Sequence, residues 1–186
     1  MSGPFVPNTC IAVFGSSEPQ PGEEAYRTAQ RVGELLATAG YAVVTGGYGG
    51  VMEAASRGAK EAAGTTIGVP CGTFDRTPNR WLTDVVPADD LYDRTRELIE
   101  RAVGYIVLPG KAGTLAELAF LWALNRAGCL EGRPVVLLGA AWPSLIENLE
   151  RNSMLEPDQL RHTHLVDSPE RAVETLDRLL PATPRS

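Results

Sequence analysis

The sequence predicts an α/β protein with a Rossmann-like, doubly wound parallel sheet in a single three-layer domain. Two observations lead to this expectation. Short, continuous apolar runs alternate with longer segments that carry apolar residues at helical spacing, and several of the runs end in glycine-rich turns. Apolar runs of about five residues are typical of strands that crossover helices cover on both faces. Such an alternation implies parallel strands, right-handed crossovers and helices on both sides of the sheet.

The expected elements follow one another along the chain. Strands are expected at 10–15, 41–45, 66–70, 103–108 and 134–139, with a short sixth strand at 164–167. Helices are expected at 23–39, 50–63, 91–102, 114–127 and 142–151. In the first helix the apolar face consists of Val32, Leu35, Leu36 and Ala39. A last helix opens at Ser168 and Pro169, because serine caps a helix N-terminus and proline fits its first turn.

The length and composition favour one domain. A chain of 186 residues with 44% hydrophobic and 22% charged residues is long enough to bury one sizeable core and short for two. We expect this domain over 10–180, with frayed tails at 1–9 and 181–186 and neither a repeat nor a linker. Segment 71–80 is the longest expected loop and is placed to cover a site.

The net charge of the chain limits the classes of partner that it can be expected to bind. A formal net charge of −6 argues against a nucleic-acid polymer or an anionic membrane, since both need clustered Lys and Arg. A small-molecule ligand is the better expectation. Residues 1–9 lack the apolar run of a secretion signal, and no stretch approaches the roughly 20 apolar residues of a membrane span. The sequence therefore predicts a cytoplasmic protein.

The cysteines and histidines suggest no metal site and no disulfide. The three cysteines are odd in number, far apart and without the paired spacing of a zinc or redox site. We expect Cys10 and Cys129 in or near the core as free thiols. His162 and His164 are expected to be an edge-strand pair rather than metal ligands.

Three loops are candidates for ligand binding, because open parallel sheets bind ligands outside the carboxyl ends of their strands. These loops are Phe14-Gly15-Ser16-Ser17, Thr45-Gly46-Gly47-Tyr48-Gly49-Gly50-Val51-Met52 and Pro109-Gly110-Lys111-Ala112-Gly113-Thr114. Glycines let a backbone approach a phosphate, and the N–H groups of the following helix hold the anion. The three loops together predict a phosphate-binding site.

Neither familiar nucleotide fingerprint fits these loops. The pattern G-x-G-x-x-G, read from Gly47, meets Met52 at its third glycine, and the P-loop pattern fails because Ala112 follows Lys111. Each loop taken alone is therefore compatible with a plain, tight strand-to-helix turn.

Two charged residues near the third loop allow two interpretations each. Thr114 and Glu117 have the spacing of a capping box, in which the carboxylate only bonds the helix N-terminus. Glu117 is otherwise a candidate catalytic carboxylate one turn behind the phosphate loop. Arg94, taken alone, is interpreted as a solvated surface residue near the start of the preceding helix.

The three loops in this order resemble the LOG (Lonely Guy) family, and the resemblance covers roughly residues 11–139. Members of that family are nucleoside 5′-monophosphate phosphoribohydrolases that make active cytokinins, and many carry the older label "possible lysine decarboxylase". We do not expect a lysine decarboxylase, because the two lysines, Lys60 and Lys111, lie in a helix and in the glycine loop.

The resemblance assigns roles to named positions. The glycine motif after the second strand is matched by Gly46, Gly47, Gly50 and Met52, and the P-G-G-x-G-T-x-x-E motif by Pro109, Gly110, Gly113, Thr114 and Glu117. The family pairs its motif Glu with an Arg that lies 15 residues before the motif proline, which here is Arg94. The turn after the first strand contributes Gly15 and Ser16 to the pocket. The resemblance thus implies Arg94 and Glu117 as catalytic residues and the others as phosphate or nucleotide ligands.

Two positions depart from the family pattern. Lys111 replaces the second motif glycine, and Thr95 replaces the lysine that follows the motif arginine. Lys111 either adds a charge-assisted contact to the ligand phosphate, points into solvent, or crowds the pocket. The segment 50–59 also looks like relatives that bind molybdenum cofactor or nucleotides without established turnover.

The resemblance implies hydrolysis of the N-glycosidic bond of a purine nucleoside 5′-monophosphate, of cytokinin type or AMP, to free base and ribose 5-phosphate, with no cofactor or metal. The alternative is a non-catalytic carrier of a nucleotide or of molybdenum cofactor. The resemblance also implies a homodimer, and the apolar residues Phe120, Leu121, Trp122 and Leu124 are candidates for its interface or for the core.

Overall fold

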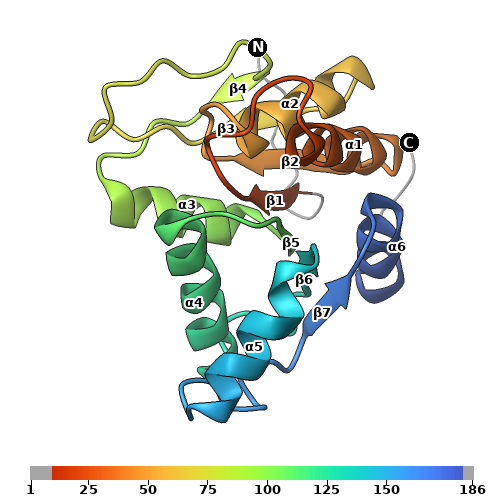
Figure 1. Ribbon diagram of the computed structural model, residues 1–186. Helices are drawn as coiled ribbons and strands as arrows, with labels where there is room; N and C mark the ends of the chain where they lie inside the picture. Colours follow the sequence, from red (N-terminus) through yellow and green to blue (C-terminus); the bar gives the residue numbers. More distant parts are fainter. Residues whose placement is uncertain (1–9, 182–186) are drawn as a thin grey trace.

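One parallel sheet runs through the computed structural model, which describes residues 10–181 (Figure 1). Its strand order is β4-β3-β2-β1-β5-β6-β7, and every pair of neighbours is parallel. The strands are β1 (Cys10–Phe14), β2 (Ala42–Thr45), β3 (Thr66–Gly68), β4 (Asp84–Val85), β5 (Gly104–Val107), β6 (Val135–Leu138) and β7 (Thr163–Val166). The expected α/β, Rossmann-like fold is confirmed.

Within residues 10–181, six helices cover the sheet, three on each side (Figure 1). They are α1 (Glu24–Thr38), α2 (Val51–Glu61), α3 (Leu91–Arg101), α4 (Ala112–Arg126), α5 (Ala141–Arg151) and α6 (Pro169–Leu179). One core cluster joins α1, α2 and α6 to the sheet, and a second joins α3, α4 and α5 to the opposite face. Strand β1 shows the division, since Ile11 and Val13 belong to the first cluster while Ala12 and Phe14 belong to the second.

The strand order reverses at β1: strands β2 to β4 follow on one side of it and strands β5 to β7 on the other. Ile11 is in register with Val43 of β2 on one side and with Gly104 of β5 on the other. All five residues of β1 are buried. The carboxyl ends of β1, β2 and β5 therefore meet at the topological switch point, where open α/β sheets bind their ligands.

Several details differ from the sequence expectation. Strand β4 pairs with β3 through Ile67 and Asp84 and was not expected, because its two residues are exposed and form no apolar run. Helix α4 begins at Ala112, two residues before the expected start at Thr114. Strand β7 covers Thr163–Val166 rather than 164–167, and it forms one edge of the sheet.

The cysteines are free thiols, but one of them lies elsewhere than expected. Cys10 and Cys71 are buried, whereas Cys129 is exposed, so its expected place in or near the core is wrong. Cys129 follows the end of α4, where Gly128 adopts a φ of +74° and turns the chain away from the helix. The expected tail at 1–9 and residues 182–186 lie outside the described residues.

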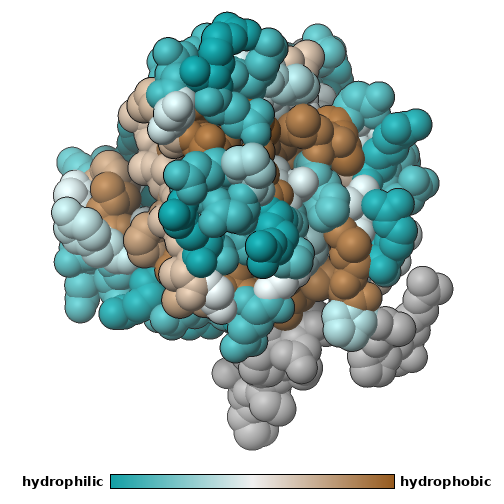
Figure 2. All heavy atoms as spheres, turned by 90° about the horizontal axis from the view of Figure 1, so that it is seen from below, coloured by the Kyte–Doolittle hydropathy of each residue, from teal (hydrophilic) through white to brown (hydrophobic). Residues whose placement is uncertain are grey.

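Among residues 10–181, no helix combines the length and apolarity needed to cross a bilayer. In the surface view of Figure 2, apolar side chains form separate patches between hydrophilic ones.

Candidate functional site

A cavity of about 150 Å³ opens at the carboxyl ends of β1, β2 and β5. Its lining comes from three loops, from helices α3 and α4, and from the segment after β3. The lining residues are Val13, Phe14, Gly15, Ser16, Ser17, Glu18, Gly46, Tyr48, Met52, Phe74, Arg76, Arg94, Lys111, Gly113, Thr114 and Glu117. The three glycine-rich loops of the sequence analysis thus converge on one cavity.

Most of the residues expected to bind or react line this cavity directly. They are Gly15, Ser16, Gly46, Met52, Arg94, Lys111, Gly113, Thr114 and Glu117. Four others, Gly47, Gly50, Pro109 and Gly110, do not line it and instead shape the loops. The carbonyl of Gly47 accepts a hydrogen bond from the Asn79 N–H (2.8 Å), and the carbonyl of Pro109 accepts one from the Ser16 N–H (3.4 Å). Gly110 packs against the side chain of Thr114.

Two of the glycines are required by close approaches. A Cβ atom at Gly46 would lie 1.6 Å from Nη2 of Arg94, so only glycine leaves room for the guanidinium there. Gly50 has a φ of +70°, and a Cβ atom at this position would lie 2.4 Å from the carbonyl oxygen of Ser16. That same oxygen accepts a hydrogen bond of 2.8 Å from the Val51 N–H, which ties the first loop to the start of α2.

The N-terminus of α4 contributes to the lining of the cavity. The first backbone hydrogen bond at this end runs from the Leu115 N–H to the Lys111 carbonyl (3.0 Å). The preceding amides of Ala112, Gly113 and Thr114 have no intrahelical acceptor, as in every α-helix, and Gly113 and Thr114 line the cavity. Such amides and the helix dipole favour a bound phosphate or carboxylate.

The capping-box interpretation of Glu117 is wrong. Lys111 is the N-cap residue of α4, and the helix has no side-chain hydrogen bond at its cap. Thr114 is therefore the third helical residue, and Glu117 lies another three residues along the helix, beyond reach of the N-cap amide. The capping function is thus absent, and Glu117 faces the cavity instead.

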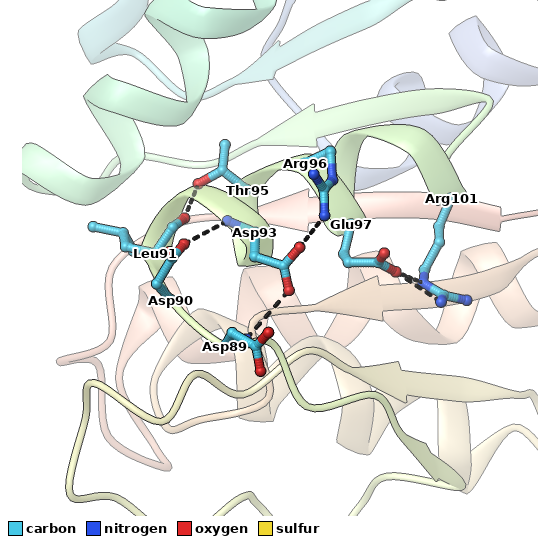
Figure 3. Close-up of polar contacts among 8 residues, drawn as sticks. All are labelled: Asp89, Asp90, Leu91, Asp93, Thr95, Arg96, Glu97 and Arg101. Carbon is cyan, nitrogen blue, oxygen red and sulfur yellow. Dashed lines mark hydrogen bonds and ion pairs between the residues drawn. The ribbon is translucent and has the colours of Figure 1, made fainter.

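Helix α3, which carries Arg94, has a network of polar contacts among its own residues and those at its N-terminus (Figure 3). The side chain of Asp90 caps the helix by accepting a hydrogen bond of 2.8 Å from the Asp93 N–H. Asp93 also forms an ion pair with Arg96 on the outer surface. Thr95, which stands where the LOG family has lysine, donates its hydroxyl proton to the Leu91 carbonyl (2.9 Å) and does not line the cavity.

Arg94 is 7% exposed, so its interpretation as a solvated surface residue is wrong. Its Nε donates a hydrogen bond of 2.9 Å to the Val69 carbonyl, and Nη2 lies 3.7 Å from Sδ of Met52. Nη1 lies 4.0 Å from Oε1 of Glu117. The guanidinium is thus held by Val69, which follows β3, and by Met52 of α2, while Nη1 faces the Glu117 carboxylate of α4.

Glu117 has a perturbed acidity. Its side chain is 13% exposed, and burial raises the pKa of its carboxyl group from 4.5 to about 7, although the charge of Arg94 acts in the opposite direction. Desolvation outweighs the ion pair because the separation of 4.0 Å is longer than a direct hydrogen bond. A carboxyl group that changes protonation state near neutral pH is suited to acid–base or electrostatic catalysis.

Seven lining residues were not among the expected site residues: Val13, Phe14, Ser17, Glu18, Tyr48, Phe74 and Arg76. Glu18 forms an ion pair of 2.5 Å with Lys111 across the cavity mouth, where both side chains are mostly exposed. Tyr48 lies inside the glycine-rich second loop, and its place in that motif was the available signal. Phe74 and Arg76 belong to segment 71–80, where the only available signal was the length of the expected loop.

Among residues 10–181, no cluster of His, Cys, Asp and Glu is arranged to hold a metal ion. His164 lies in the edge strand β7, and His162 precedes it. The pKa of His164 is lowered, chiefly by burial and also by the charges of Arg178 and His162.

A doubly wound parallel sheet with glycine turns, a helix N-terminus and a buried Arg–Glu pair at its switch point defines a nucleotide-binding Rossmann-like protein. The chain belongs to the SLOG cluster4 family, whose model matches residues 8–173. The similarity to the LOG family that the motifs indicated is confirmed by this match and by the relatives below.

Two relatives illustrate this family relationship, and one solved structure shows the same fold. An uncharacterized protein of Archaeoglobus fulgidus is 33% identical over 130 residues, which are 69% of this chain and 83% of the relative. The cytokinin riboside 5′-monophosphate phosphoribohydrolase of Mycobacterium marinum is 31% identical over 130 residues, or 68% of this chain and 69% of the relative. The solved structure of the molybdenum cofactor binding protein from Rippkaea orientalis superimposes with a TM-score of 0.73 at 24% identity, covering 92% of this chain and 96% of that one.

Proposed function

We propose that the protein hydrolyses the N-glycosidic bond of a purine nucleoside 5′-monophosphate and releases the free base and ribose 5-phosphate. The observation that carries this proposal is the buried pair of Arg94 and Glu117, 4.0 Å apart, beside the N-terminus of α4. The sequence similarity to the cytokinin riboside 5′-monophosphate phosphoribohydrolase of Mycobacterium marinum supports the same class of reaction.

The 5′-phosphate is assigned to the N-terminus of α4. The amides of Gly113 and Thr114 and the neighbouring Ser16 line this end of the cavity, and they provide uncharged donors to the phosphate oxygens. Lys111 adds a positive charge when it exchanges its surface partner Glu18 for the phosphate. Binding the phosphate here places the ribose over the more deeply buried part of the site, where Glu117 and Arg94 lie.

Glu117 acts on the reacting carbon in this proposal. Cleavage of the bond between the base nitrogen and C1′ leaves the electron pair on the base and builds positive charge on the ribose ring. The ionised carboxylate stabilises that charge and takes a proton from the water that attacks C1′, while the departing base acquires one proton. Arg94 orients the carboxylate and keeps part of the Glu117 population ionised near neutral pH, because its charge lowers the pKa of that group.

The cavity of about 150 Å³ is smaller than the pockets of roughly 300–1,000 Å³ that enclose drug-sized ligands. A nucleotide therefore has its ribose phosphate inside the cavity and its base against the residues at the rim. This division separates the chemistry of ribose release from the recognition of the base.

A carrier of a nucleotide or of molybdenum cofactor is the second candidate. It is favoured by the match over 92% of the chain to the molybdenum cofactor binding protein of Rippkaea orientalis. If the protein is a carrier, it should bind its ligand saturably and release no base. Mass spectrometry of a ligand that copurifies with the protein would identify what it carries.

We also propose that the protein is a homodimer that uses the outer face of α4. Of the four apolar residues expected there, Leu121 and Trp122 lie in the core and Leu124 is partly buried, while Phe120 is 48% exposed. Leu115 on the same helix is 43% exposed. Light scattering at several concentrations should give twice the chain mass, and Phe120→Asp should give the monomer mass; a wild-type monomer contradicts the proposal.

The experiment that tests the reaction is the release of free base from AMP and prenylated AMP, followed by chromatography. Glu117→Gln should lose on the order of 10²-fold or more in rate, the usual contribution of a positioned acid–base group. Glu100→Gln, an exposed carboxyl on α3, is the matched control and should retain the wild-type rate. Equal turnover by Glu117→Gln and wild type would reject the assignment.

A further inference from the structure

The candidate site has an aromatic end that the assigned chemistry does not use. Tyr48 and Phe74 meet edge to face there, with ring centroids 5.9 Å apart and an interplanar angle of 89°. Tyr48 is buried, and its hydroxyl accepts a hydrogen bond from the Cys71 N–H (2.9 Å) and donates one to the Cys71 carbonyl (3.0 Å). Phe74 is 38% exposed and lines the cavity. A rigid tyrosine thus supports a phenylalanine ring that a planar ligand can reach.

Arg76 lies beside the Phe74 ring, and its guanidinium is free to bind a ligand. Its Cζ lies 6.0 Å from the Phe74 ring centroid, and the side chain lines the cavity. Within residues 10–181, the Arg76 guanidinium has no recorded hydrogen bond or ion pair, whereas Arg94 is engaged by Val69 and Met52. Arg76 is therefore a free hydrogen-bond donor at the aromatic end.

The backbone acceptors near this end are already engaged. The Gly47 carbonyl accepts hydrogen bonds from both the backbone N–H and Nδ2 of Asn79, and the Cys71 carbonyl accepts from the Tyr48 hydroxyl and the Phe74 N–H. The carbonyls of Tyr48 and Val69 each accept one hydrogen bond, from Asn79 and Arg94 respectively. These carbonyls thus already accept at least one hydrogen bond each, whereas the guanidinium of Arg76 is a donor open to a ligand.

We propose that Phe74 and Arg76 form the base subsite and that they select a 6-oxopurine 5′-monophosphate over a 6-aminopurine one. This inference rests on the proposed hydrolysis of a purine nucleotide. The base stacks on the exposed ring of Phe74, and the Arg76 guanidinium moves from the ring to the edge of the base. A 6-oxopurine presents two acceptors, O6 and N7, which match the guanidinium fork, whereas adenine presents an amino group that needs an acceptor.

Arg76 is assigned to the base rather than to the phosphate because each end of the cavity has its own donors. The phosphate end has the α4 amides and Lys111, which reaches across to Glu18. Arg76 instead contacts Phe74, which packs on Tyr48 and lies 6.0 Å from the Arg94 guanidinium. Ribose 5-phosphate, which has no base, distinguishes the two assignments.

The test compares base release from IMP, GMP and AMP by wild type and by Arg76→Ala. Wild type should favour IMP and GMP over AMP by about tenfold or more in kcat/KM, the discrimination of one bidentate pair. Arg76→Ala should bring this ratio close to one, through a loss on IMP and GMP, and Arg76→Lys should not restore it because it lacks the fork. Arg80→Ala is the matched control: Arg80 stacks on Trp81 outside the cavity, and its loss should leave the ratio unchanged.

Three results would overturn the inference. Wild type could prefer AMP, or Arg76→Ala could keep the wild-type ratio of kcat/KM for IMP and GMP over AMP. In the third result, Arg76→Ala would also be inhibited more weakly by ribose 5-phosphate than wild type is. The last result would assign Arg76 to the phosphate. If wild type releases no base from any nucleotide, the proposed hydrolysis fails, and calorimetric binding of IMP and AMP to wild type and Arg76→Ala then tests the base subsite separately. Equal affinity of wild type for both nucleotides refutes the subsite.

Discussion

The substitution Arg94→Met should raise the pKa of Glu117, because it removes the positive charge and keeps most of the side-chain volume. The two charged groups are 4.0 Å apart, between Nη1 of Arg94 and Oε1 of Glu117. At an effective dielectric constant of about 20, two unit charges at this distance interact by about 4 kcal/mol. Each pKa unit corresponds to about 1.4 kcal/mol, and charged neighbours commonly change carboxyl pKa values by about 1–3. The pKa of Glu117, about 7 in the wild type, should rise by about 1–3.

The assay is a carbon-13 NMR titration of protein labelled at the glutamate side-chain carboxyls, with the Glu117 signal assigned by its absence in Glu117→Gln. Arg96→Met on the same helix is the matched control, since Arg96 is exposed and pairs with Asp93 rather than with Glu117. Its Glu117 signal should titrate as in the wild type. An unchanged or lowered Glu117 pKa in Arg94→Met would refute the electrostatic coupling that the proposed mechanism requires.

Three further outcomes are expected. Because the pKa of Glu117 is raised in the folded state, the free energy of unfolding of wild type relative to Glu117→Gln should be highest below pH 4.5 and fall by about 3 kcal/mol as pH rises through 7. The same difference in unfolding free energy between the two proteins at pH 4 and at pH 8 would contradict this. Gly46→Ala places a methyl group against the Arg94 guanidinium and should lower kcat for base release by roughly 10²-fold. Gly72→Ala is the control and should leave kcat unchanged, because its Cβ would meet only the Asp89 carbonyl, at 3.8 Å. Glu18→Gln frees Lys111 and should tighten binding of ribose 5-phosphate by up to about fivefold at low salt in calorimetry, and weaker binding would contradict the proposed exchange of partners.

The sheet could be predicted from the sequence wherever its strands are buried on both faces. Strands β1, β5 and β6 are continuous apolar runs because helices cover both of their sides. Strand β4 could not be predicted, since Asp84 and Val85 are exposed and are held only by pairing with β3. Local pattern therefore identified the core strands and missed the edge strand that lacks a hydrophobic signal.

The candidate site was predictable in its loops and less so in its side chains. The glycine turns and the spacing between Arg94 and Glu117 are local features of the sequence, and these residues do meet in one cavity. The burial of Arg94 could not be deduced, because it depends on the Val69 carbonyl and on the missing side chain of Gly46, both distant along the chain. The start of α4 at Ala112 likewise depends on the extended backbone of Lys111, which removes the capping alternative.

Segment 71–80 shows the same limit. Its length suggested a cover for the site, but the place of Arg76 in the cavity follows from long-range contacts. Asn79 bonds the Gly47 and Tyr48 carbonyls, and the Tyr48 hydroxyl bonds Cys71, so the second glycine loop positions the segment. A contact between residues more than 20 positions apart, Tyr48 and Cys71, thus helps to position the proposed base subsite.

The most direct test of the central claim is a paired measurement of free base and ribose 5-phosphate released from purine nucleoside 5′-monophosphates by wild type and Glu117→Gln. Wild type should release the two products in equal amounts, and Glu117→Gln should bind the nucleotide but turn it over on the order of 10²-fold more slowly. Wild-type protein that binds a nucleotide and releases neither product, or a Glu117→Gln variant as fast as wild type, would contradict the account.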